Sequence, residues 1–365
     1  MTTAAMPGAP AAGSAGRATR AAALGASGLR ASPLWLGAMT FGDTTDAAEA
    51  ARIVAAARDA GLNAIDTADA YANGESERIV GRLIAGDRSR WVLATKVANP
   101  MGVLRGGPGA PPAPAEPNDR GLSRRWLTHA VDHSLNRLGT DWIDLWYLHR
   151  DDEVTPVEET VETLGRLIAA GKILYWGVSN FRAWRVARIV ETARRMGVPP
   201  PIACQPPYNA MTRGIETELL PACAHYGLGV VAYSPLARGV LTGKYTPGAE
   251  PEPGTRAARK DTRLMQTEWR RESLDLAQRF KAYAAQRGLS PGQLAAAWVL
   301  NNRLVTGLIG GPRTLAQWQD YIAALDVALS PEDEAFVSGL VPAGHSSTYG
   351  FTDPIYPVTG RPPKG

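Results

Sequence analysis

Four side chains have types and positions that suit proton transfer to a carbonyl oxygen. Asp66 and Tyr71 lie in the segment IDTADAY, Lys96 lies in LATKV, and His149 ends LWYLH. A phenol has a pKa near ~10, and a neighbouring ammonium lowers it by favouring the phenolate. A carboxylate can hold that ammonium, and an imidazole can orient a carbonyl oxygen. The set predicts a proton donor for hydride reduction of a carbonyl, with the hydride coming from a cofactor.

Three of these residues end short apolar segments, and Tyr71 follows Asp66 by five positions. Eight such segments occur along the chain, each bounded by polar, Gly or Pro residues. They are Leu34–Gly37, Leu62–Asp66, Trp91–Lys96, Trp142–His149, Ile173–Ser179, Ile202–Gln205, Leu228–Ser234 and Leu304–Gly310. Continuous apolar runs of this length are typical of parallel strands that are buried on both faces.

Helical patterns separate these segments, at 46–60, 75–85, 123–138, 156–170, 182–196, 214–225, 291–302 and 314–326. Eight strand–helix units in series predict a (β/α)8 TIM barrel, whose strand ends meet at one catalytic face. An open doubly wound sheet is the alternative, but it would need a G-x-G-x-x-G turn after an early strand, and none occurs in that context. Two extra helices are expected at 269–286 and 331–339. Long loops at 99–121 and 235–268 follow strands, so we expect them on the catalytic face.

Composition along the chain indicates where the barrel begins and ends. The chain has 365 residues, of which 45% are hydrophobic and 20% charged, so it is not disordered throughout. Residues 1–30 are rich in Ala and Gly, and we expect a disordered extension there, with a targeting segment as the alternative. The barrel is expected over residues 31–340. Residues 341–365 carry aromatics and prolines without a helical period, and we expect them to cover the active-site face.

The composition also argues against several kinds of partner. No apolar run reaches ~18 residues, so no membrane partner is expected. No block of five Lys or Arg residues occurs, so a nucleic-acid partner is not expected despite the net charge of +4. Cys204 and Cys223 are too few for a disulfide framework and suit the cytoplasm. His129 and His133 have a spacing that can bind zinc, but no further ligand accompanies them, so no metal site is predicted. The strong preference for Arg over Lys suggests a GC-rich bacterial genome.

Several motifs together resemble the aldo-keto reductase superfamily, over roughly residues 27–340. They are LGAMTFGD at 36–43, IDTADAYANGESERIVGRL at 65–83, KV at 96–97, LGTDWIDLWYLHRDD at 138–152, GVSNF at 177–181, QPPYN at 205–209 and AYSPLARGVLTGKY at 232–245. The last two are similar to the branch that includes potassium-channel β subunits and many bacterial reductases. The resemblance implies that Tyr71 is the general acid, that Lys96 tunes its pKa, that Asp66 holds Lys96, and that His149 orients the carbonyl.

The resemblance also implies NADP(H), bound in an extended pose across the barrel mouth. The implied cofactor-binding residues are Met39, Asp66, Ser179, Asn180, Gln205, Tyr233, Ser234, Pro235, Leu236, Gly239, Leu241, Lys244, Arg256, Gly311, Arg313, Gln317 and Asp320. Either Tyr208 or Tyr233 would stack on the nicotinamide ring, with Tyr233 preferred. Arg313, at a helix N-terminus, would bind the 2′-phosphate. Gly310 and Tyr321 depart from the family pattern, and Tyr321 could stack on adenine.

For the substrate, the expected contacts are Phe41, Tyr71, Trp126 and His149, with the tail near Tyr349–Tyr356. The sequence predicts an NADPH-dependent reductase of an aldehyde or ketone, a small-molecule carbonyl substrate, and a reaction that also runs toward alcohol oxidation. A keto-sugar or sugar-nucleotide reductase of secondary metabolism is an alternative. A non-catalytic NADP(H)-binding, redox-sensing subunit and a metal-dependent hydrolase are further alternatives. A homo-oligomer is compatible with the sequence.

Overall fold

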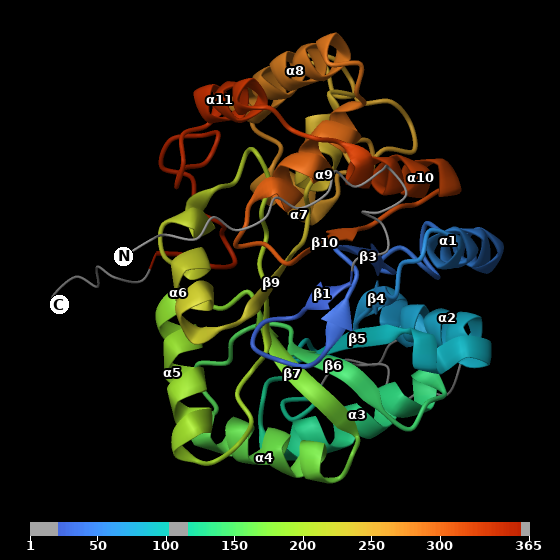
Figure 1. The fold of residues 1–365 in the computed structure, drawn as a ribbon, viewed down its shortest axis with the longest axis vertical. Helices are drawn as coiled ribbons and strands as arrows, with labels where there is room; N and C mark the ends of the chain where they lie inside the picture. The colour runs from blue at the N-terminus through green and yellow to red at the C-terminus, as the bar shows by residue number, and fades with distance from the viewer. Residues whose placement is uncertain (1–20, 102–115, 359–365) are drawn as a thin grey trace, which may run out of the picture.

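Eight parallel strands close into a barrel in the computed structural model, which describes residues 21–101 and 116–358. The strands are β3 (Leu34–Gly37), β4 (Ala64–Asp66), β5 (Val92–Val97), β6 (Ile143–Leu148), β7 (Ile173–Ser179), β8 (Ala203–Gln205), β9 (Gly229–Ala232) and β10 (Gly307–Gly310). The barrel closes because β10 pairs with both β9 and β3, through Leu308 opposite Ala232 and opposite Leu34. The predicted TIM barrel is confirmed, and each predicted strand is present (Figure 1).

The strand register places the chemical side chains at one end of the barrel. Asp66, the last residue of β4, lies opposite Gly37 and Ala94. Ser179 at the end of β7 lies opposite Gln205 at the end of β8. Because all strands run the same way, their carboxyl ends form a single mouth, which is the face that carries active sites in this architecture.

Helices surround the barrel in the predicted order. They are α1 (Ala47–Asp59), α2 (Glu75–Ile84), α3 (Arg124–Leu138), α4 (Val157–Ala169), α5 (Ala183–Arg195), α6 (Leu219–Tyr226), α9 (Pro291–Asn301) and α10 (Leu315–Ala323). Several starts are fixed by side-chain caps: the Ser123, Ser290 and Thr314 oxygens accept backbone N–H groups of the first turn. Helix α6 begins later than expected because Pro221 lacks an N–H and is tolerated only in a first turn.

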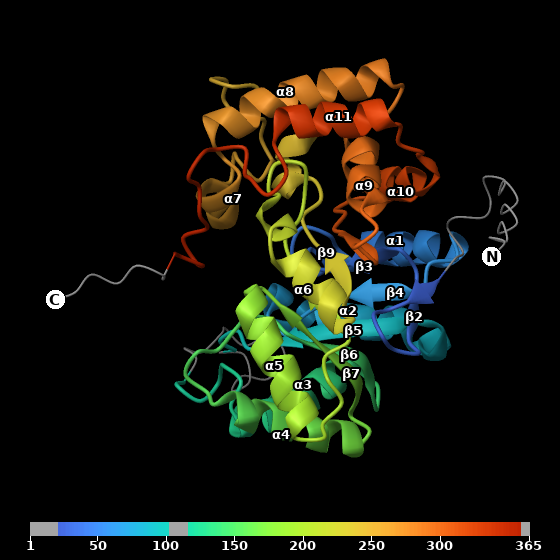
Figure 2. The same cartoon turned by 60° about the vertical axis from the view of Figure 1, so that its left-hand side comes forward.

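The two extra helices are α8 (Arg271–Gln286) and α11 (Pro331–Leu340), and they lie side by side (Figure 2). The Tyr283 and Phe336 rings stack with their centroids 3.8 Å apart. Asp333 accepts hydrogen bonds from Tyr283 and Arg287, so α8 and α11 are also tied by polar contacts. Short elements that the sequence did not predict are α7 (Thr262–Thr267), η2 (Tyr71–Gly74), η3 (Ala85–Arg90) and η6 (Ala237–Thr242). Two further short elements, η5 (Gly214–Glu216) and η7 (Ala324–Asp326), lie within the helices predicted at 214–225 and 314–326.

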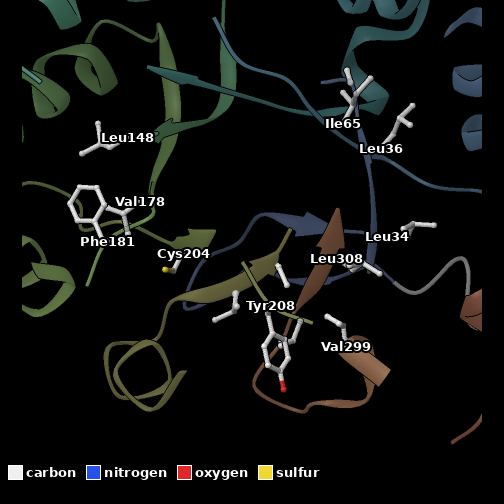
Figure 3. Close-up of a cluster of buried hydrophobic side chains, with 14 of the residues drawn as sticks. Leu34, Leu36, Ile65, Leu148, Val178, Phe181, Cys204, Tyr208, Val299 and Leu308 are labelled. Carbon is white, nitrogen blue, oxygen red and sulfur yellow. The ribbon is translucent and has the colours of Figure 1, made fainter. Parts of the chain in front are cut away.

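Alternating strand residues divide the core into two layers. Trp35, between Leu34 and Leu36 on β3, belongs to the layer inside the barrel together with Tyr147. Leu34 and Leu36 belong to the layer between the strands and the helices. Figure 3 shows part of this outer layer, where strand side chains meet Val299 of α9. Both layers hold the strands rigidly, so the residues at their ends are fixed in position.

The stretch 21–30 is ordered, so the expected disorder up to residue 30 is wrong for these residues. Strands β1 (Ala22–Ala23) and β2 (Arg30–Ala31) form an antiparallel hairpin across the opposite end of the barrel (Figure 1). Leu24 is fully buried in the interior layer. Gly25 has φ +58°, and a Cβ there would lie 2.4 Å from the Ile202 carbonyl oxygen. The small residues that suggested disorder instead permit this close approach. Residues 1–20 lie outside the described residues.

Two long loops and the C-terminal segment were expected on the catalytic face, and the structure describes the second loop and most of the C-terminal segment. Most of the loop at 99–121 lies outside the described residues. The loop at 235–268 contributes Lys244 and Arg256 to the mouth. The C-terminal segment reaches the same face, because Ile355 and Tyr356 line the cavity described below. Within the described ranges, no helix is both long and apolar enough to cross a membrane.

Candidate active site

A cavity of about 590 Å³ opens at the mouth of the barrel. Most of the residues that the sequence singles out line it together. They are Met39, Asp66, Tyr71, His149, Ser179, Asn180, Gln205, Tyr233, Ser234, Pro235, Leu236, Gly239, Lys244, Arg256, Gly311, Arg313, Gln317 and Asp320. Residues separated by more than two hundred positions therefore share one surface, because every strand ends at the same mouth.

Three of the four proposed catalytic residues form one connected chain, in which Asp66 and Tyr71 line the cavity and Lys96 lies behind them. The fully buried Lys96 ammonium makes an ion pair with Asp66 and donates to the Thr67 carbonyl oxygen at 2.8 Å. Its third hydrogen bond goes to the Tyr71 hydroxyl oxygen at 3.1 Å. An ammonium has three donors, so all three are used and its position is fixed. Because the Tyr71 oxygen accepts from Lys96, its own proton is free to point into the cavity.

Burial decides the direction of the Tyr71 pKa. Removal from water raises the pKa of the phenol, and the Lys96 charge pulls it down, but the net direction is upward. The expected lowering of the Tyr71 pKa is thus present as a contribution but is outweighed by burial. Burial also opposes the charge on Lys96, yet Asp66 and Tyr71 raise its pKa above the ordinary value. Tyr71 is therefore protonated at neutral pH, beside a permanently charged ammonium.

His149 is a neutral imidazole. Burial, the Lys96 charge and the Arg150 charge hold its pKa well below the usual value. The Asn99 amide nitrogen Nδ2 lies 2.9 Å from Nδ1 of His149. An amide nitrogen can only donate, so this contact favours the tautomer whose ring proton is on Nε2. The His149 and Tyr71 rings meet edge to face with their centroids 5.8 Å apart. Two proton donors, the Tyr71 hydroxyl and the His149 Nε2–H, thus belong to neighbouring rings on the cavity wall.

Polar side chains that could hold a nicotinamide carboxamide are joined to the same network. The Gln205 amide donates to Asp66 at 2.9 Å, which leaves the Gln205 side-chain oxygen available to a ligand. The Asn180 amide donates to the His149 carbonyl oxygen and to Ser179, and its oxygen accepts from the Tyr233 hydroxyl at 2.7 Å. Asn180 therefore has no free donor, and it can bind a carboxamide only through its oxygen. Its φ of 60° is strained for a non-glycine residue, as is common where side chains serve a site.

Three cations gather at the other end of the cavity. Lys244 has a lowered pKa because of burial and the charges of Arg313 and Arg256. Arg256 is only loosely paired with Asp261, at 3.4 Å. Arg313 lies just before α10, and its guanidinium donates to the Gly254 carbonyl oxygen. These cations repel one another in a half-buried cleft, and a bound polyanion would relieve the repulsion. This end of the cavity therefore fits phosphate groups.

Asp320 and Tyr321, near which the sequence predicts an adenine contact, are both held in position. Asp320 accepts from Ser290 at 2.8 Å, and a Cβ on Gly292 would lie 2.4 Å from its carboxylate, so the residue at 292 must be small. Tyr321 lies on the cavity wall, and burial raises its pKa well above the usual range. Tyr321 is thus a neutral ring in the place where the sequence suggested stacking.

Four expected contacts do not reach the cavity. Phe41 is fully buried in the outer core, and Trp126 lies on the face of α3 that packs against the barrel, so both substrate assignments are wrong. Leu241 also packs in the core rather than along the cavity. Tyr208 donates to Glu216 beside a separate, smaller cavity, which leaves Tyr233 as the ring at the mouth. Packing in the apolar core decided the orientation of Phe41, Trp126 and Leu241, whereas Tyr208 is also held by its hydrogen bond to Glu216.

Several lining residues were not predicted. Asn99 and Arg150 each lie two positions after the end of a strand, β5 and β6. Their proximity to a strand end could have predicted them from the sequence. Arg238 and Arg263 come from the long loop after β9, whose course the sequence does not define. Tyr356 was expected only as part of a broader tail segment, and the exposed Tyr349 of that segment does not line the cavity.

A TIM barrel with a buried Asp–Lys–Tyr chain and a neutral histidine at its mouth defines an oxidoreductase of carbonyl groups. The family model described as "Aldo/keto reductase family" matches residues 33–340, and the chain belongs to this family.

Curated relatives cover most of the chain. A "Probable voltage-gated potassium channel subunit beta" from Oryza sativa subsp. japonica is 40% identical over 316 residues, which is 85% of this chain and 92% of that protein. The "Uncharacterized oxidoreductase YrpG" of Bacillus subtilis is 36% identical, over 89% of this chain and 97% of its own length. The "L-glyceraldehyde 3-phosphate reductase" of Escherichia coli K12 is 34% identical, over 83% and 86%.

Proposed function

We propose that the protein is an NADP(H)-dependent reductase of aldehydes or ketones, with Tyr71 as the general acid. The observation that carries this proposal is the Asp66–Lys96–Tyr71 chain beside the neutral His149. The unpaired sulfhydryls of Cys204 and Cys223 agree with a cytoplasmic location, which is part of the proposal.

The residues have distinct tasks in this reaction. A bound nicotinamide cofactor would supply the hydride. Tyr71 gives its proton to the carbonyl oxygen as negative charge develops there, and Lys96 stabilises the phenolate that remains. His149 donates Nε2–H to the same oxygen and so orients the carbonyl. In the reverse direction the Tyr71 phenolate accepts the proton of the alcohol.

The preference for NADP(H) rests on the cations at the far end of the cavity. Lys244, Arg256 and Arg313 all line it, and Arg313 adjoins the first turn of α10. A 2′-phosphate adds negative charge that a guanidinium fork can bind through two hydrogen bonds. The donor set at this end therefore suits NADP(H) better than NAD(H).

The test is to follow NADPH oxidation with a panel of aldehydes and ketones, for the wild type and for Tyr71→Phe. Loss of the acid should lower kcat by about 10²–10⁴-fold while NADPH still binds. Tyr349→Phe is the matched control, because this tyrosine is fully exposed and outside the cavity. Equal rates in the wild type and Tyr71→Phe would reject the role of Tyr71.

A second candidate function is suggested by relatives from Oryza sativa, Arabidopsis thaliana and Schizosaccharomyces pombe that are named as potassium channel β subunits. In that case the chain would bind NADP(H) as a redox-sensing subunit without appreciable turnover. Fluorescence titration with NADPH, run beside the carbonyl panel, separates the two. Tight binding with no turnover of any carbonyl favours the subunit, whereas turnover that depends on Tyr71 favours the reductase.

A further inference from the structure

The cavity has more positive charge than its phosphate end accounts for. Six basic side chains line it, namely Arg150, Arg238, Lys244, Arg256, Arg263 and Arg313, against two acidic ones, Asp66 and Asp320. Asp66 is already bound by Lys96, and Asp320 accepts from Ser290. Three of the cations belong to the phosphate end, so the others need a separate explanation.

Arg150 lies at the catalytic end of the cavity. It directly follows His149, and its charge contributes to the lowered pKa of that imidazole. Its charge also acts on the Tyr356 phenol, which reaches the cavity from the C-terminal segment, and both side chains line the cavity. Arg150 and Tyr356 therefore share this cavity with Tyr71 and His149.

Arg150 has no carboxylate partner among the residues that the structure describes. Asp151 is bound in a fork by Arg185, at 2.7 and 2.6 Å. Asp152 accepts from the loop at Leu122 and Thr155 instead. The adjacent acids are therefore committed elsewhere, although both follow Arg150 in the sequence.

The other two cations near this end are compensated. Arg263 forms an ion pair with Asp353. Arg238 donates to Thr267 at 3.1 Å and lies within electrostatic range of the buried Glu268. Arg150 is thus the cation at the catalytic end that is left to pair with a ligand.

We propose that the carbonyl substrate carries an anionic group, a carboxylate or a phosphate, and that Arg150 and Tyr356 bind it beside the reacting carbonyl. This inference rests on the proposed reductase function. A guanidinium presents two parallel N–H donors that match a carboxylate or a phosphate, and the Tyr356 hydroxyl adds a third donor. Binding the anion next to His149 would hold the carbonyl against the two proton donors.

The experiment compares matched pairs of substrates that differ in charge. Succinic semialdehyde against butanal tests a carboxylate, and glyceraldehyde 3-phosphate against glyceraldehyde tests a phosphate. For each pair, kcat/KM is measured at saturating NADPH in the wild type, Arg150→Gln, Arg150→Lys and Arg195→Gln. Arg195 is a largely exposed residue of α5, so its loss changes the net charge equally without touching the cavity.

The wild type should prefer the anionic member of at least one pair, and that pair identifies the anion. Arg150→Gln should lower the preference by about 10- to 100-fold, mainly through KM, because a hydrogen bond to a charged group is lost. Arg150→Lys should restore part of it, and Arg195→Gln should leave it unchanged. A second measurement is competitive inhibition by succinate or inorganic phosphate against the neutral aldehyde, which Arg150→Gln should weaken.

Three results would overturn the inference. The wild type could show no preference for either anionic substrate, Arg150→Gln could affect both members of each pair equally, or neither anion could compete. An equal effect would mean that Arg150 acts through His149 or by holding the tail. Turnover of neutral aldehydes without an anion preference rejects only this inference, whereas absence of all turnover rejects the reductase function itself.

Discussion

Asn99 shows how one side chain outside the four proposed catalytic residues can set the chemistry of the site. Its amide nitrogen faces Nδ1 of His149, and this contact selects the tautomer with a proton on Nε2. The backbone of His149 is held from the other side by Asn180. A neutral imidazole that lost the Asn99 contact could place its proton on either nitrogen, and only one of these tautomers can donate to a carbonyl oxygen.

We expect Asn99→Leu to lower kcat by about 10-fold, because one hydrogen bond of roughly 1.5 kcal/mol no longer favours the donating tautomer. The dissociation constant for NADPH, measured by fluorescence titration, should change little, since Asn99 contacts the histidine. Asn99→Asp should shift the kcat–pH profile, because a carboxylate favours a proton on Nδ1 and raises the pKa of His149. A variant with unchanged kcat and pH profile would show that Asn99 does not position the ring.

At the scale of elements, the N-terminal hairpin covers one end of the barrel, although its Ala- and Gly-rich composition suggested disorder. Leu24 is buried inside the barrel with Trp35 and Tyr147, at the end opposite the active site. The Ala26 amide donates to the Gly227 carbonyl oxygen at 2.7 Å, which fixes the turn against the loop before β9. The hairpin thus closes the interior layer where the strands alone would leave it open to water.

Leu24→Ala should lower the free energy of unfolding by about 2–4 kcal/mol, because it leaves a cavity among side chains that are themselves held by the strands. Urea unfolding followed by tryptophan fluorescence measures this change. Leu174→Ala is the control, since this leucine of β7 is exposed and its loss should cost less than about 0.5 kcal/mol. Equal destabilisation by both variants would argue against the closing role of the hairpin.

For the whole molecule, the distribution of charge matters more than its sum. The net charge is only +4, yet the cavity has six basic side chains against two acidic ones. Walls of protein around a cleft concentrate the field of the charges that line it, so anionic ligands are attracted to the mouth rather than to the general surface.

Arg313→Gln should reduce the preference for NADPH over NADH, taken as the ratio of kcat/KM values, by about 10- to 100-fold. The loss should come from NADPH, because only NADPH carries the 2′-phosphate. The remaining preference should also fall with added salt, since part of Arg313 is exposed. Arg166→Gln, on the exposed face of α4, removes the same charge and should leave the ratio unaltered. An unchanged ratio in Arg313→Gln would place the 2′-phosphate elsewhere.

The sequence by itself determined the order of strands and helices. Apolar runs such as Ile173–Ser179 are local signals, read over a few residues. It also determined that Asp66, Lys96 and His149 meet, because parallel strands must end at one mouth. These inferences depend only on periodicity and on the geometry of a closed barrel.

Tertiary structure decided which side chains turn toward the cavity and what their charges do there. Phe41 and Trp126 have suitable types, but packing against neighbouring helices buries them. The pKa of Tyr71 rises because burial outweighs Lys96, and burial is a sum over distant segments that no local pattern contains. Asp151 follows Arg150 directly in the sequence, yet in the fold it pairs with Arg185 on α5. Such competition between partners is settled in three dimensions, since the competing groups are far apart in the chain.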